Sequence, residues 1–73
     1  MTNTKELERL ISESGLKKNY IARVLGLSRH GLRNKILNIH SFTTREVQTL
    51  CDLLHIEDLV VKEYIFFCSM GDF

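Results

Sequence analysis

Residues 16–38 read LKKNYIARVLGLSRHGLRNKILN, and this stretch decides the fold that the sequence predicts. It predicts two short helices, residues 17–25 and Arg29 to about Leu37, joined by a tight turn. Gly26 supplies the turn residue because glycine adopts a positive φ without steric cost. Ser28 is a good N-cap for the second helix, since its hydroxyl can accept a hydrogen bond from a free backbone N–H.

Each of these helices has an apolar side at helical spacing. We expect Ile21, Val24 and Leu25 to face inward from the first helix, and Leu32 and Ile36 from the second. The other side of the second helix is mostly polar: the residues that point away from the stripe are His30, Arg33, Asn34 and Leu37. One helix braced by another, with a polar outer face, is the layout of a helix-turn-helix.

Charge is distributed unevenly along the chain. The net charge of the 73 residues is only +1. From Lys17 to Arg45, however, there are seven Lys or Arg and no Asp or Glu, whereas the rest of the chain has three basic and nine acidic residues, a balance of 3 − 9 = −6. We call residues 17–45 the acid-free segment. Such a bipolar chain can present one positive face to a polyanion.

The flanking sequence predicts further helices in one domain, residues 1–73, of all-α class with about five short helices. Thr4 to Ser14 has an apolar stripe, a capping residue in Asn3, with Thr4 as a competing cap, and a C-terminal glycine in Gly15. Thr43 and Glu46 have capping-box spacing at the start of a helix that runs to about Leu54. Its predicted core residues are Val47, Leu50, Cys51 and Leu54.

Residues 57–73 give the weakest signal and are a helix or a tail. We predict a short helix over about Asp58 to Phe66, with Leu59, Val60 and Ile65 inward. The alternative is an edge strand, because several of its residues are strong strand formers. The segment is apolar enough to contact a partner, and the candidate contact residues are Tyr64, Phe66, Phe67 and Phe73.

Other functional classes have little support in the sequence. Cys51 and Cys68 fit no zinc pattern, so we expect reduced cysteines, with Cys51 in the core and the role of Cys68 open. No catalytic grouping or phosphate loop stands out, so we expect no enzyme, cofactor or small-molecule ligand. There is no signal peptide and no apolar run of about 20 residues, which makes the cytoplasm the expected compartment and a membrane an unexpected partner.

The chain resembles the lambda-repressor/Cro-like (XRE-type) helix-turn-helix family, over about residues 5–56. The resemblance rests on Ile21-Ala22, Leu25-Gly26-Leu27-Ser28, Leu32, Asn34-Lys35-Ile36, Phe42 and the helix from Thr43 to Leu54. It implies a lambda-repressor-like domain that regulates transcription, often by repression, in a bacterial or phage-infected cell. Specific binding by one small module usually needs two copies on a palindromic operator, so a homodimer is expected.

The outer face of the second helix then holds the candidate base contacts. These are Arg29, His30, Arg33 and Asn34, because Arg can bond guanine and Asn can bond adenine through two atoms. The candidate phosphate contacts are the polar and basic residues around them: Lys17, Lys18, Asn19, Ser28, Lys35, Asn38, His40 and Arg45.

Two alternatives stay open, one for the role of Gly31 and one for the partner of the polar face. The missing side chain of Gly31 lets the helix come close either to DNA or to the preceding helix. The whole face binds double-stranded DNA or, as the alternative function, a repressor protein whose operator contacts it modulates, as an antirepressor does.

Overall fold

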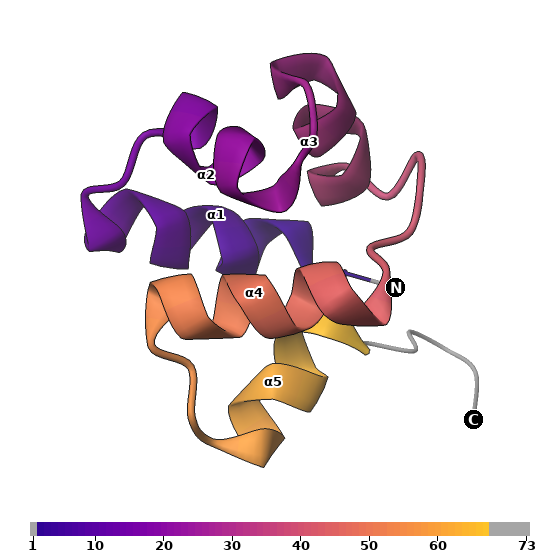
Figure 1. Cartoon of the computed structure of the whole chain (residues 1–73). Helices are drawn as coiled ribbons and strands as arrows, with labels where there is room; N and C mark the ends of the chain where they lie inside the picture. Colours follow the sequence, from indigo (N-terminus) through magenta and orange to yellow (C-terminus); the bar gives the residue numbers. More distant parts are fainter. Residues whose placement is uncertain (1, 68–73) are drawn as a thin grey trace.

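A computed structural model describes residues 2–67, and within that range the chain forms five α-helices and no strand (Figure 1). They are α1 (Thr4–Ser14), α2 (Lys18–Leu25), α3 (Arg29–Ile36), α4 (Thr44–Leu54) and α5 (Leu59–Phe66). The predicted all-α class is confirmed, and each predicted helix is present to within about one residue at its ends. Two residues discussed above, Cys68 and Phe73, lie outside the described residues.

Local capping fixes where the helices begin and end, as the sequence predicted. Asn3 Oδ1 accepts a hydrogen bond from the N–H of Glu6 at the start of α1. Thr43 and Glu46 form a complete capping box at α4, with side chain to backbone distances of 3.1 and 2.9 Å. Gly15 and Gly26 end α1 and α2 with φ of 76° and 74°, a conformation that favours glycine.

Helix α1 runs through the middle of the molecule and contacts α3, α4 and α5 (Figure 1). Helices α2 and α3 lie on one side of α1, and α5 lies on the other. The core is made of side chains that are at most 4% exposed, from every helix: Leu7, Ile11, Ile21, Ala22, Leu32, Ile36, Val47, Leu50, Cys51, Ile65 and Phe66. Cys51 lies in the core as predicted, and burial raises the pKa of its thiol.

Predictions of core positions were wrong at three residues, in two helices. Val24, predicted to face inward, is 42% exposed, because α2 packs through Ile21 and Ala22 and the position of Val24 falls outside that stripe. Leu59 and Val60 are 72% and 75% exposed, because α5 packs through its second half, where Ile65 is fully buried.

Phe66 is also placed differently from the expected partner contact. Its side chain is 4% exposed and packs edge to face against Phe42, with ring centroids 5.9 Å apart. The backbone N–H of Asn3 donates to the carbonyl of Ile65, which ties the same end of α5 to the start of α1. Phe66 is therefore a core residue, whereas Tyr64 and Phe67 are 58% and 55% exposed.

Candidate nucleic-acid interface

Helix α3 is anchored on one side and exposed on the other. Ser28 Oγ accepts from the N–H of Gly31 at 2.9 Å and caps its first turn. Leu32 and Ile36 are 0% and 1% exposed and hold α3 against the core. The predicted base contacts lie on the remaining surface, where Arg29, His30 and Arg33 are exposed and Asn34 is half-buried.

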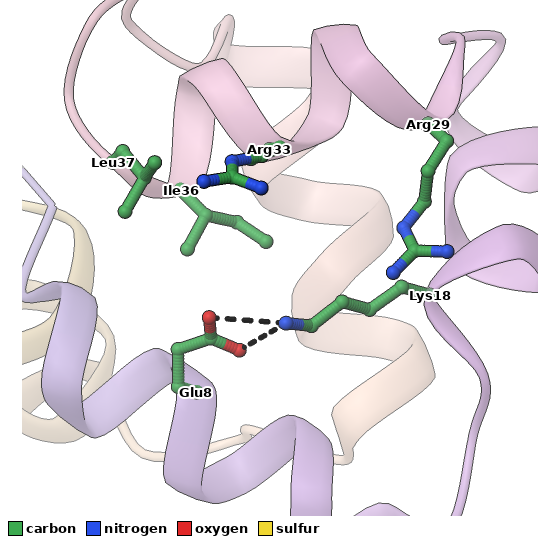
Figure 2. Close-up of a pocket in the computed structure, with 6 residues that line it drawn as sticks. All are labelled: Glu8, Lys18, Arg29, Arg33, Ile36 and Leu37. Atoms are coloured by element: carbon green, nitrogen blue, oxygen red, sulfur yellow. Dashed lines mark hydrogen bonds and ion pairs between the residues drawn. The ribbon is translucent and has the colours of Figure 1, made fainter.

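Arg29 and Arg33 lie one turn apart and line a pocket of about 290 Å³ between α1, α2 and α3 (Figure 2). Its other lining residues are Glu8, Lys18, Ile36 and Leu37. Arg29 Nη1 also donates to Asn19 Oδ1 at 3.0 Å, which restricts the guanidinium to the α2 side of α3. Three cations, one carboxylate and two apolar side chains therefore line this α1–α3 pocket.

Lys18 is paired with an acid that sequence reasoning missed. Its Nζ lies 2.8 Å from Glu8 Oε1, and both side chains are about one-third exposed, at 34% and 39%. Figure 2 shows this pair beneath the two arginines. The Lys18 charge is therefore partly neutralised by α1, although it stays close enough to the surface to change partner.

Lys35, predicted to contact phosphate, instead joins α3 to α4. Its Nζ lies 2.6 Å from Glu46 Oε1, and the two side chains are only 16% and 12% exposed. Burial alone raises the pKa of Glu46, but hydrogen bonds from Lys35 and Thr43 outweigh it and hold that pKa below its usual value. Lys35 is thus placed as a structural partner of α4.

Asn38 is likewise engaged within the protein. It has a positive φ of 67°, which fits the predicted end of the helix. Its Oδ1 accepts from the N–H of Thr2 and its Nδ2 donates to the Thr2 carbonyl, both at 2.8 Å. Both ends of the Asn38 amide are therefore used, which leaves it poorly placed for the predicted phosphate contact.

Gly31 does not pack closely on α2, and its other interpretation, close approach to DNA, stays a prediction. A Cβ built there would lie 3.2 Å from Ser28 Oγ and 3.9 Å from Leu27 Cβ, and no atom of α2 is that close. The absence of a side chain thus leaves room for the Ser28 cap. Ser28 is accordingly placed as a helix cap, although it is exposed.

The remaining cations of the acid-free segment are exposed. Within residues 2–67, five of its seven Lys and Arg side chains have no acidic partner within ion-pair distance: Lys17, Arg23, Arg29, Arg33 and Arg45. Arg23 and Arg45 line a second hollow, between α2 and α4. Asn19 and His40, the other predicted phosphate contacts, are exposed as well.

Residues 2–67 contain neither a cluster of metal ligands nor a membrane-spanning helix. No group of three or more His, Cys, Asp or Glu lies together as metal ligands would. No helix in this range is long and apolar enough to cross a membrane. Comparison with protein families, with characterised proteins and with solved structures finds no match for this chain.

Proposed function

We propose that the protein is a sequence-specific DNA-binding regulator of transcription, in which α2 and α3 act as a helix-turn-helix and α3 enters the major groove. The observation that carries the proposal is the outer face of α3. It exposes Arg29, His30 and Arg33 in a segment that contains no acidic residue. Arg is the side chain that most often reads guanine in the major groove.

The cations around α3 support the same proposal. Besides Arg29 and Arg33, three exposed cations have no acidic partner among the described residues: Lys17 just before α2, Arg23 on α2 and Arg45 at the start of α4. Backbone contacts of this kind position a protein on duplex DNA without reading its sequence. Two copies on a palindromic operator would supply the area that one small module lacks.

The test is selection of duplexes from a randomised library, followed by binding of the selected duplex across a salt series. If each copy places Lys17, Arg23 and Arg45 on phosphates, the slope of log K against log salt is about −2.7 per copy. Arg33→Ala is expected to weaken binding by about 1–3 kcal/mol and to relax preference at one base pair. Lys62→Met is the matched control, because it removes a positive charge from α5, on the far side of α1 (Figure 1).

A modulator that binds a repressor protein is the second candidate. It is favoured by the two ion pairs, which withdraw Lys18 and Lys35 from the basic surface, and by the exposed apolar residues of α5. Failure to enrich any duplex at low salt, together with tight binding to a purified repressor, would replace the first proposal with this one.

A further inference from the structure

Two neighbouring hollows lie between the ends of α1 and α4 and the start of α5. Their volumes are about 280 and 180 Å³, and Leu10, Leu54 and His55 line both, so they are two compartments of one groove. An apolar cavity of about 150 Å³ holds a benzene ring, so each compartment has room for one large apolar side chain. The apolar residues of this α1–α4–α5 groove are Leu10, Leu16, Leu53, Leu54, Ile56 and Val61.

Hydrogen bonds hold the walls of the groove in place. At the end of α4, His55 has a positive φ of 57°, and the N–H of Ile56 donates back to the Cys51 carbonyl at 2.8 Å. At the end of α1, Ser14 Oγ accepts from the N–H of Leu16 at 3.1 Å. A partner would therefore meet a surface that is already formed, and binding would cost little ordering of this chain.

The rim of the groove is acidic. Glu13, Glu57 and Asp58 line it, and none of its lining residues is Lys or Arg. Residues 46–61 contain four acidic side chains and no Lys or Arg, the reverse of the acid-free segment. Among the described residues, Glu57 and Asp58 are exposed and form no ion pair, whereas Glu13 is paired with Arg9. Two carboxylates of the rim can therefore pair with cations of a partner.

The groove also lies away from the outer face of α3. None of its lining residues belongs to α2 or α3. Figure 1 shows the C-terminal ends of α1 and α4 at one end of the molecule, with α3 toward the other end. A partner in the groove would thus leave Arg29 and Arg33 exposed.

Charge and shape together select the occupant. The acidic rim repels phosphate, so nucleic acid is unsuited to it. A second copy docked by the same surface would set one acidic rim against another, and residues 68–73 contain one acid, Asp72, and no base. A helix with apolar side chains three or four residues apart, and with Lys or Arg beside them, matches both the paired compartments and the rim.

We infer that the α1–α4–α5 groove docks a basic amphipathic helix of another protein, with an apolar side chain in each compartment and Lys or Arg against Glu57 and Asp58. Docking is independent of the proposed function. Only its consequence, that the protein holds DNA through α3 and a partner at the same time, rests on that function.

The probe is a peptide selected from a randomised display library on the full chain. Selected sequences should have large apolar residues three or four positions apart and an excess of Lys and Arg. A scrambled peptide of the same composition should bind at least about tenfold more weakly, because it loses the apolar contacts and keeps only the charge. Enrichment of acidic peptides, or of none, would overturn the inference.

Two matched pairs of substitutions separate the groove from overall charge and apolarity. Glu57→Lys should weaken binding of the selected peptide by about three- to tenfold, whereas Glu63→Lys, at an exposed acid of α5 outside the groove, should have little effect. Val61→Ser should weaken binding by about threefold or more, whereas Val60→Ser, at a valine that lines neither compartment, should not. Fluorescence anisotropy measures the four affinities, and circular dichroism checks the helix content. Equal effects within each pair would contradict docking in the groove.

NMR locates the peptide on wild type without any substitution. The peptide should shift the signals of Leu10, Leu54 and Val61 and leave those of Arg33 unchanged. NOEs in the free protein from Leu10 to residues 68–73, or to a second copy, would show another occupant and overturn the inference. A chain that binds a selected duplex but no such peptide would overturn only the inference, whereas one that binds the peptide but no duplex would overturn only the proposed function.

Discussion

Lys18 Nζ lies 2.8 Å from Oε1 and 3.0 Å from Oε2 of Glu8, so α1 places a carboxylate within the basic surface of α2 and α3. Arg29 and Arg33 lie on the same pocket. A DNA phosphate that approached this pocket would compete with Glu8 for the same cation. Under the proposed function, Glu8 therefore lowers the affinity of this surface for DNA.

Glu8→Gln is accordingly expected to strengthen binding to a selected duplex. It removes a negative charge near the phosphates and frees Lys18, so affinity at low salt should rise about two- to fivefold, and the salt slope should steepen by about 0.9. Fluorescence anisotropy across a salt series measures both. The cost in stability should stay below about 1 kcal/mol, because the pair is partly exposed.

Glu13→Gln is the control for that measurement. Glu13 is another acid of α1, paired with Arg9 rather than with a residue of α2 or α3. It should leave DNA affinity almost unchanged. Equal effects of the two substitutions would mean that only net charge matters, and unchanged or weaker binding by Glu8→Gln would contradict the role given to Glu8.

Lys35→Met separates a structural role from a phosphate contact. The Lys35–Glu46 pair is mostly buried, so its loss should destabilise the protein, by about 1–3 kcal/mol in denaturant unfolding. Affinity for the selected duplex, measured where the variant is fully folded, should not change. Arg23→Ala, at an exposed and unpaired cation, should show the reverse pattern. Weaker DNA binding by the Lys35→Met variant would instead support the predicted contact between Lys35 and a phosphate.

The same pair gives stability a pH dependence. Because the folded-state pKa of Glu46 is held below 4.5, its contribution is fully present above the unfolded-state pKa and is lost as pH falls through the folded-state value. Glu46→Gln should therefore be clearly less stable than wild type at pH 6–7, and the gap should narrow below about pH 4.5. Urea unfolding of both proteins at several pH values measures the gap, and a gap that widened on acidification would contradict the assignment.

The helices were predictable because their signals are local. The capping residues Asn3, Ser28 and Thr43 and the glycines at 15 and 26 each act within a few residues of themselves. Helix α5 shows the limit of such signals. Its apolar residues lie on more than one side of the helix, so periodicity did not indicate which side is buried, and packing of Ile65 and Phe66 on the rest of the fold decided it.

Which side chains of the candidate site are free was less predictable, because it depends on contacts between residues of different helices. The partner of Lys18 lies ten residues earlier, on α1, and the partner of Lys35 lies eleven residues later, on α4. Asn38 is bound by Thr2, thirty-six residues away. A side chain that looks free in the sequence is then engaged in the fold. Exposure of His30 and Arg33, by contrast, follows from helix periodicity, whereas Arg29 lies on the side of Leu32 and is exposed at the first residue of α3.

Asn38 offers a test of what the N-terminal contact contributes. Asn38→Gly keeps the positive φ but loses the two hydrogen bonds to Thr2, and should cost about 1–2 kcal/mol of unfolding free energy. Asn38→Ala loses the same bonds and adds the strain of an L-residue in the left-handed region, about 1 kcal/mol more. Thermal unfolding of the two variants shows which of them loses more stability. An equal cost for both would mean that the backbone relaxes, and no cost for Asn38→Gly would mean that Thr2 adds nothing to stability.

Gly31 and Ser28 are expected to be energetically coupled. Alanine normally stabilises a helix by about 1 kcal/mol over glycine, but a Cβ at position 31 would lie 3.2 Å from Ser28 Oγ and disturb the cap. Gly31→Ala should therefore change stability by less than about 0.5 kcal/mol in wild type. Glycine is a tolerable N-cap without a hydroxyl, so in a Ser28→Gly background the same substitution should stabilise by nearly the full amount. The coupling is measured by a double-mutant cycle, from the unfolding free energies of wild type, the two single variants and the double variant. Equal effects in both backgrounds would assign Gly31 to something other than the cap, and close approach to DNA would then be tested by duplex binding of Gly31→Ala.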